Sequence, residues 1–207
     1  MIDLLTPLKP FATLPWLAMS PLEVIATVMA VWCVWAYARE NIWAWPTGLV
    51  TVILQLVLFW DIKLYGEACL QGIYIVLQIY GWMVWARGDG RGDELAITRT
   101  SARLWLTLTF IAIAGVVPVA LALKHLSDST TPWWDAAPSV LSLIAQWMIT
   151  HKKLENWYVW ILVNLLSIPL FADKGLYLIS LLNVLLLIIS IFGVRRWAQT
   201  PRASAAA

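Results

Sequence analysis

Residues 59–85 read FWDIKLYGEACLQGIYIVLQIYGWMVW, and residues 171–197 read FADKGLYLISLLNVLLLIISIFGVRRW. The two stretches align without a gap at an offset of 112 residues. Apolar helices use few residue types, so the informative matches are those at acidic, glycine and tryptophan positions. These matches are Asp61 with Asp173, Gly81 with Gly193, and Trp85 with Trp197. They indicate an internal repeat, in which the last part of the chain copies an earlier part.

The repeat extends upstream of residue 59, where the matches fall at an offset of 115 residues. They are Ala30 with Ala145, Trp32 with Trp147, Glu40 with Glu155, Asn41 with Asn156, and Trp45 with Trp160. A three-residue gap within the second apolar segment would reconcile the two offsets. We therefore expect two copies of a unit that contains three apolar segments.

The composition is typical of a membrane protein that crosses the bilayer several times. Of the 207 residues, 61% are hydrophobic and 13% are charged, and the mean hydropathy is +0.77. A soluble domain is about 45–50% apolar and about 25% charged. We therefore expect the lipid bilayer, and not a nucleic acid, to be the large partner of this chain.

The apolar segments are long enough to be membrane spans. A helix needs about 20 residues to cross about 30 Å of hydrocarbon. Backbone polar groups in lipid must pair with one another, so these spans are expected to be helices. Apolar runs between clusters of charge give seven spans, at residues 21–38, 42–60, 64–86, 103–123, 136–150, 156–172 and 175–194.

The repeat and the seven spans together predict an all-α integral membrane protein with a 3+1+3 plan. Residues 21–86 would form a first three-helix bundle, residues 103–123 a linker helix, and residues 136–197 a second bundle. One linker helix gives both bundles the same direction across the membrane. Parallel repeats are a transporter plan, shared with the SWEET carriers, in which the solute binds between the halves near the midplane.

The basic residues predict how the chain is oriented. Seven spans place the two termini on opposite sides of the membrane. One side carries four of the fourteen basic residues, namely Lys9, Lys63, Lys124 and Lys174, and the other side carries the remaining ten. Because the more basic side is usually cytoplasmic, we expect the N-terminus outside and the C-terminus in the cytoplasm.

The third span carries polar and aromatic side chains along one face. Steps of three or four residues place on this stripe Gln71, Tyr74, Gln78, Trp82 and Trp85. The repeat partners of the two glutamines are Asn183 and Ser190. Both halves are therefore expected to present amide or hydroxyl groups at a matching depth.

Two interpretations of these groups are open. Amides in the middle of spans, such as Gln55 and Asn164, can join helices through hydrogen bonds worth about 0.6–2 kcal/mol each. A polar cluster at one depth can instead bind a solute, while Trp and Tyr rings, among them Trp160, stack on a flat or cationic ring. A solute site would be an enclosed, aromatic-lined cavity, whereas helix-joining amides would be packed without space.

The sequence contains little that suggests chemistry or ion coupling. No acidic residue lies near the middle of a span, whereas ion-coupled carriers usually bury a carboxylate or another ionisable relay. No metal-ligand cluster, phosphate-binding loop or nucleophile–base pair is apparent. We therefore expect a protein that is not an enzyme and uses no cofactor or metal, and that binds its solute for passive diffusion.

Four segments resemble the PnuC family of vitamin transporters. They are ENIWAWPTG (40–48), LQIYGWMVW (77–85), ENWYVWILVN (155–164) and DKGLYLISLLN (173–183), and the similarity covers about residues 20–197. The resemblance implies a homotrimer in the bacterial cytoplasmic (inner) membrane that imports nicotinamide riboside by facilitated diffusion. A separate cytoplasmic kinase would then trap the vitamin by phosphorylation.

The resemblance leaves the vitamin open, because relatives carry thiamine or riboflavin. Riboflavin fits an aromatic site for a cation less well, because it is larger and neutral. A membrane scaffold protein that binds no solute is a further alternative, and there the mid-span amides would only pair across helices.

The residues expected to bind substrate are the mid-span polar groups and the aromatic residues near the repeat matches. They are Gln55, Gln71, Tyr74, Gln78, Trp82, Trp85, Trp160, Tyr177, Asn183 and Ser190. The 115-residue offset pairs two Glu-Asn dipeptides at the cytoplasmic ends of the two halves. These dipeptides are the expected inner gate, formed by Glu40, Asn41, Glu155 and Asn156.

Overall fold

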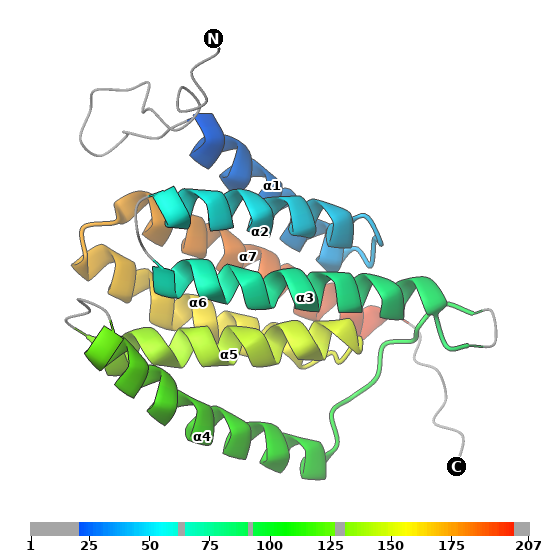
Figure 1. Ribbon diagram of the computed structural model, residues 1–207. Coiled ribbons are helices and arrows are strands. Elements are labelled where there is room, and N and C mark those ends of the chain that lie inside the picture. Colours follow the sequence, from blue (N-terminus) through cyan, green and yellow to red (C-terminus); the bar gives the residue numbers. More distant parts are fainter. Residues whose placement is uncertain (1–20, 62–64, 91–92, 127–130, 201–207) are drawn as a thin grey trace.

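A computed structural model describes residues 21–61, 65–90, 93–126 and 131–200, and these residues form seven helices (Figure 1). The helices are α1 (Pro21–Ala38), α2 (Ala44–Asp61), α3 (Tyr65–Arg87), α4 (Ala102–Leu126), α5 (Pro132–Thr150), α6 (Asn156–Asp173) and α7 (Tyr177–Gln199). Each predicted span coincides with one helix, so the all-α fold with seven helices is confirmed.

The helix bounds differ from the predicted spans mainly at two places. Helix α5 begins at Pro132 rather than at residue 136. Proline suits the first turn of a helix, because the N–H that it lacks has no partner there. Helix α7 continues to Gln199, beyond the predicted end at residue 194, because Arg195 and Arg196 extend the helix past the apolar run.

Among the residues that the structure describes, four segments are long and apolar enough to cross a membrane, namely Ala44–Asp61, Ala68–Arg87, Ala102–His125 and Tyr177–Gln199. Helices α5 and α6 bury more polar side chains. These are Ser142, Gln146 and Thr150 on α5, and Asn156, Asn164 and Ser167 on α6. These side chains face the interior of the bundle, so they make both helices less apolar without placing polar groups in lipid.

The helices pack as two three-helix units with a linker helix outside them (Figure 1). Helix α2 packs between α1 and α3, and α6 packs between α5 and α7. The two units meet where α1 packs against α7 and α3 packs against α5. Helix α4 lies at the edge of the bundle against α5, and its side chains Leu106, Phe110 and Ile113 are exposed. Such an apolar outer face is suited to hydrocarbon.

The two units have the same register throughout. Helices α2 and α6 begin at residues 44 and 156 and end at residues 61 and 173, while α3 and α7 span residues 65–87 and 177–199. Both pairs are thus offset by 112 residues at each end. Helices α1 and α5 also end 112 residues apart, at Ala38 and Thr150.

The connections α1–α2 and α5–α6 also share the 112-residue offset. A left-handed backbone conformation occurs at Glu40, with a φ of 58°, and at Lys152, with a φ of 43°. The Asn41 N–H donates to the carbonyl of Ala36, and the Lys153 N–H donates to the carbonyl of Met148. The positions equivalent to Glu40 and Asn41 are therefore Lys152 and Lys153.

The expected upstream offset of 115 residues, with its three-residue gap, is consequently wrong. It paired Glu40-Asn41 with Glu155-Asn156 and Trp45 with Trp160, whereas the structure makes Trp45 equivalent to Trp157. A second Glu-Asn dipeptide and a second tryptophan happen to lie three residues further along the chain. Backbone turns and helix packing, which set the true register, are not visible in those identities.

Each unit has the same aromatic core near the connection of its first two helices. A Cβ atom on Gly81 would lie 2.0 Å from the ring of Trp45, and one on Gly193 would lie 2.5 Å from the ring of Trp157. The Trp45 and Trp85 rings meet edge to face at 5.4 Å, and the Trp157 and Trp197 rings meet in the same way at 5.5 Å. The glycine and tryptophan matches in the sequence are thus two copies of one core.

A segment of the α3–α4 connection lies along the second unit. We call residues 95–100 the strap. The Thr98 N–H donates to the Lys152 carbonyl at 3.0 Å, and the Leu154 N–H donates to the Thr98 carbonyl at 3.0 Å. Ile97, a residue of the strap, is buried in the hydrophobic core. The strap therefore attaches the connection between α5 and α6 to the chain that leads into α4.

Candidate functional site

A cavity of about 170 Å³ lies between the two units. Most of its lining comes from α1, α2 and α3, and the rest comes from α5 and α6. Its small and apolar lining residues are Ala30, Cys33, Val34, Gly48, Val52 and Ile149. The cavity is lined from both units and is partly open rather than fully enclosed.

Polar groups in the cavity are neutral. They are the hydroxyl of Thr51 and the side-chain amides of Gln55, Gln71, Gln78 and Gln146. The Gln71 Oε1 and Gln146 Nε2 atoms are buried and have no hydrogen-bond partner within the described part of the chain. Because a buried polar group without a partner is costly, these two atoms are suited to a bound solute.

Aromatic side chains complete the lining. They are Tyr37, Tyr74, Trp157 and Trp160. The Tyr74 hydroxyl donates to the Ser142 hydroxyl on α5, so it also connects the two units. The cavity can therefore hold a small solute with a flat ring and several hydrogen-bonding groups, and its rings would favour a cation.

The Gln78 amide is held from two sides. The Tyr37 hydroxyl donates to Gln78 Oε1 at 2.6 Å. On α2, a Cβ atom on Gly48 would lie 2.6 Å from Gln78 Nε2 and 2.9 Å from Cys33 Sγ. The bare backbone at Gly48 thus provides the space that the Gln78 amide occupies.

Five of the ten expected binding residues line the cavity. They are Gln55, Gln71, Tyr74, Gln78 and Trp160. Of the polar and aromatic stripe on the third span, Gln71, Tyr74 and Gln78 therefore line the cavity, whereas the two tryptophans do not. Gln71 and Gln78 are both buried, on the side of α3 that faces the interior.

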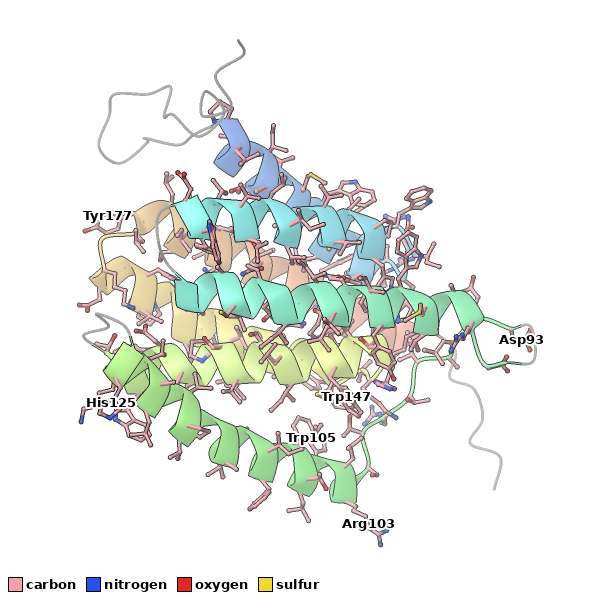
Figure 2. The ribbon with its side chains drawn as sticks, in the orientation of Figure 1. Asp93, Arg103, Trp105, His125, Trp147 and Tyr177 are labelled. Carbon is pink, nitrogen blue, oxygen red and sulfur yellow. The ribbon has the colours of Figure 1, made fainter. Side chains whose placement is uncertain are left out.

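The other five expected residues lie outside the cavity lining. Trp85 is in the aromatic core, where its Nε1–H donates to the carbonyls of Ile149 and Thr150. Trp82 and Tyr177 are exposed. Figure 2 shows Tyr177 at one end of the bundle and Asp93 near the other end.

Asn183 and Ser190, the repeat partners of Gln71 and Gln78, make hydrogen bonds within their own helix. The Asn183 amide donates to the Ile179 carbonyl at 2.8 Å. The Ser190 hydroxyl donates to the Leu186 carbonyl at 2.8 Å. In this conformation the polar groups of the repeat therefore face the cavity from the first unit and not from the second.

The cavity is off-centre because equivalent positions differ in size and polarity. At the 112-residue offset, Gly48 corresponds to Trp160, and Tyr74 corresponds to Leu186. Glycine in the first unit leaves room for the Gln78 amide, whereas the equivalent position in the second unit carries the large Trp160 side chain. The two units therefore share a backbone plan but line the site unequally: most of the polar groups come from the first unit, while Gln146, Trp157 and Trp160 come from the second.

Several lining residues were not singled out from the sequence. The position equivalent to Gln146 is Val34, and the position equivalent to Tyr37 is Ile149. Because these partners are apolar, polar groups that recur in both halves do not include Gln146 or Tyr37. Trp157 lies at a span end, where tryptophan usually marks the membrane interface. A polar side chain within an apolar span is the signal that could have identified Gln146.

The expected gate residues lie at the ends of the units but are not equivalent pairs. Glu40 forms an ion pair with Lys152 at 3.0 Å, and the Lys152 ammonium also lies 4.7 Å from the centre of the Trp85 ring. Glu155 is buried and accepts hydrogen bonds from the backbone N–H and the hydroxyl of Thr100, each at 2.8 Å.

The two asparagines of the expected gate differ in exposure. Asn41 is exposed, and its Oδ1 accepts a hydrogen bond from the Trp43 N–H. Asn156 is buried at the start of α6, where its Nδ2 donates to the Lys153 carbonyl at 2.6 Å. Of the four expected gate residues, Glu40 is the one that forms an ion pair across the two units, with Lys152.

Comparison with known proteins gives consistent matches over most of the chain. A family model described as nicotinamide mononucleotide transporter matches residues 20–199. The chain is 29% identical over 209 residues to the nicotinamide riboside transporter PnuC of Escherichia coli (strain K12), covering 89% of this chain and 87% of that protein. It is also 29% identical over 165 residues to the riboflavin/roseoflavin transporter RibM of Streptomyces davaonensis, covering 77% and 76% of the two chains.

A solved structure matches the fold as well. It is described as the crystal structure of the vitamin B3 transporter PnuC, and it superposes with a TM-score of 0.72 at 27% sequence identity. The match covers 86% of this chain and 80% of that chain. The similarity therefore includes the arrangement of helices that surrounds the cavity.

Proposed function

Because the chain belongs to the nicotinamide mononucleotide transporter family, which includes the PnuC vitamin transporters, we propose that it carries nicotinamide riboside across the membrane. The observation that carries this proposal is the cavity between the two units, which is lined by amides and aromatic rings. Nicotinamide riboside has a flat cationic ring, a carboxamide and ribose hydroxyls. Each of these groups has a complementary group in the cavity.

The contacts with the solute come from the residues that line the cavity. Amide contacts come from Gln55, Gln71 and Gln78, while Tyr74 and Trp160 provide rings. The other expected binding residues lie outside the lining and act in helix packing or at the surface. They are Trp82, Trp85, Tyr177, Asn183 and Ser190.

The transport mechanism is facilitated diffusion. The cavity holds neutral amides, hydroxyls and rings, which bind a solute through contacts that it can leave in either direction. A cytoplasmic kinase that phosphorylates the vitamin would make net uptake irreversible. The inner gate is formed by the ends of the units, where Glu40 pairs with Lys152, with Asn41, Glu155 and Asn156 beside them.

The protein acts as a homotrimer in the bacterial inner membrane, with its C-terminus in the cytoplasm. The excess of basic residues on the side of the α3–α4 connection supports this orientation. The exposed apolar face of α4 supports contact with lipid or with another subunit. Gel filtration with light scattering in detergent would measure the number of subunits, and protease access to the C-terminus in sealed vesicles would measure the orientation.

Riboflavin is the second candidate, because the RibM relative shares the same 29% identity with this chain. Nicotinamide riboside is preferred here because its ring is cationic, whereas riboflavin is neutral, and the cavity is lined by aromatic rings. Thiamine, which also has a cationic ring, is the third vitamin to compare. A scaffold that binds none of these vitamins is the remaining alternative.

The test is isothermal calorimetry on the purified full chain in detergent with nicotinamide riboside, thiamine and riboflavin. We expect saturable binding of nicotinamide riboside, and uptake of the same labelled vitamin into proteoliposomes. Preferred binding of thiamine or riboflavin would reassign the substrate. If folded protein bound none of the three vitamins, the scaffold alternative would replace the proposed function.

A further inference from the structure

Tyr37, a lining residue of the cavity, is held in place by the aromatic core of the first unit. Its side chain is buried, and its ring meets Trp45 edge to face at 4.9 Å and Trp85 at 6.0 Å. Trp45 is itself held against the bare backbone of Gly81. The aromatic core of the first unit therefore fixes the Tyr37 hydroxyl at the wall of the cavity.

The Tyr37 hydroxyl determines which end of the Gln78 amide the cavity receives. It donates to Gln78 Oε1 at 2.6 Å, so the oxygen of this amide is already engaged. The amide is also confined by the close approach of its Nε2 to Gly48. A glutamine amide has one oxygen and one NH₂ group, and because the Tyr37 hydroxyl lies on the oxygen, the NH₂ group is the part of this amide that can donate to a solute.

Gln71 presents the opposite polarity further along the same helix. Its Oε1 is buried and has no hydrogen-bond partner in the part of the chain that the structure describes. Gln71 and Gln78 are seven residues apart on one face of α3, a separation of about 10 Å along the helix axis. The cavity thus offers a hydrogen-bond donor at one level and an acceptor two helical turns away.

We infer that Tyr37 is a positioning residue, which holds the Gln78 amide with its NH₂ group toward the solute and so selects a ring that carries a carbonyl oxygen. Gln71 Oε1 accepts a hydrogen bond from a hydroxyl group at the other end of the same solute. This inference rests on the proposed function, and it assigns the carboxamide of the nucleoside to the Gln78 level and the sugar to the Gln71 level.

The test is a binding cycle that combines a protein variant with a ligand analogue. Calorimetry compares nicotinamide riboside with the riboside of unsubstituted pyridine, which lacks the carboxamide but keeps the cationic ring and the sugar. Tyr37→Phe removes the hydroxyl and keeps the ring contacts with Trp45 and Trp85. We expect this variant to bind nicotinamide riboside about tenfold more weakly and the pyridine riboside as well as the wild type does.

A matched control and a second variant complete the cycle. Tyr80→Phe removes a tyrosine hydroxyl from the same bundle, at an exposed position beside His151, and should leave both affinities unchanged. Gln78→Glu keeps the Tyr37 contact but replaces the NH₂ group by an oxygen. It should lose the preference for nicotinamide riboside over the pyridine riboside even if Tyr37→Phe lowers the stability of the protein.

The outcomes separate this inference from the proposed function. If the wild type binds nicotinamide riboside but Tyr37→Phe weakens both ligands equally, or neither, the positioning role is overturned and the function stands. A Gln78→Glu variant that keeps the wild-type preference would overturn it as well. Failure of the wild type to bind either riboside would overturn the proposed function and this inference together.

Discussion

At the scale of single residues, the two glycines that the repeat matches have a defined role. Gly81 and Gly193 let a tryptophan ring of the neighbouring helix lie directly on the α3 or α7 backbone. The rings of Trp45 and Trp157 are completely buried as a result. The repeat is therefore most visible at residues that allow two helices to approach closely, where few other residue types fit.

The close contact at Gly81 predicts a loss of stability on substitution. In Gly81→Ala the new Cβ atom would lie 2.0 Å from a rigid indole ring, so the helices must move apart. Overpacking of this kind costs about 1–3 kcal/mol. Gly72→Ala on the same helix has open space around its Cβ atom, and should leave stability unchanged or raise it slightly. Thermal unfolding in detergent would measure both variants, and equal melting temperatures would contradict the prediction.

The position of the cavity predicts different effects for two equivalent amides. Gln71→Leu removes a buried acceptor from the cavity lining and should weaken binding of nicotinamide riboside about tenfold or more. Asn183→Leu changes the repeat partner, which bonds within its own helix, and should leave affinity within about twofold. Calorimetry would measure the affinity of both variants for nicotinamide riboside. An equal loss of affinity in the two variants would contradict the prediction and place the solute between both amides.

At the scale of elements, the strap distinguishes the two units. Residues 95–100 attach to the α5–α6 connection through backbone hydrogen bonds and through Glu155. In the α1–α2 connection, by contrast, Asn41, Ile42 and Trp43 are exposed. A rearrangement at this end of the molecule should therefore move the first unit's connection more than the second's.

The contact between the strap and Glu155 predicts a change in protease sensitivity. Glu155→Ala removes an acceptor that two groups of Thr100 share. Hydrogen bonds to a charged group contribute about 1.5–3 kcal/mol. The population of molecules with a detached strap should therefore be at least about tenfold larger in this variant than in the wild type. Trypsin cleavage after Arg99, followed by mass spectrometry, would measure this release. Glu94→Ala, at an exposed glutamate of the same connection, serves as the control, and equal cleavage rates in the two variants would refute the role of Glu155.

At the scale of the whole molecule, the units are joined at equivalent positions. Glu40 and Lys152 share the left-handed backbone conformation and the 112-residue offset, and their side chains form an ion pair between the units. The Lys152 side chain is 4% exposed and that of Glu40 is 20% exposed, so this pair is partly shielded from water. Loss of the carboxylate would leave a buried ammonium without its partner, which favours separation of the units at this end.

This arrangement predicts that the ion pair controls access to the cavity. Cys33 lines the cavity and is buried, so its reaction with a maleimide reports opening. In a Cys69→Ser background, Glu40→Gln should increase the labelling rate about tenfold. The exchanged pair, Glu40→Lys with Lys152→Glu, should restore slow labelling. An unchanged rate in Glu40→Gln, or failure of the exchanged pair to restore it, would show that the ion pair does not control the gate.

Much of the fold could be predicted from the sequence because it depends on local patterns. Long apolar runs between charges predict helices wherever backbone groups must pair within lipid, and all seven were found. The gap-free match of residues 59–85 with residues 171–197 predicted the register of the units correctly, because Gly81, Gly193, Trp85 and Trp197 belong to a core that both units build in the same way.

The sequence by itself thus determined the helices, their grouping into two related units and the presence of polar groups on α3. The tertiary structure alone decided the upstream register, the pairing of Glu40 with Lys152, and the side from which the cavity is lined. These features depend on side-chain volumes and turns that meet across helices. The Gln78 amide of α3 lies against Gly48 of α2, whereas the position equivalent to Gly48 in the second unit carries Trp160. The sequence of either helix alone does not reveal such contacts between helices.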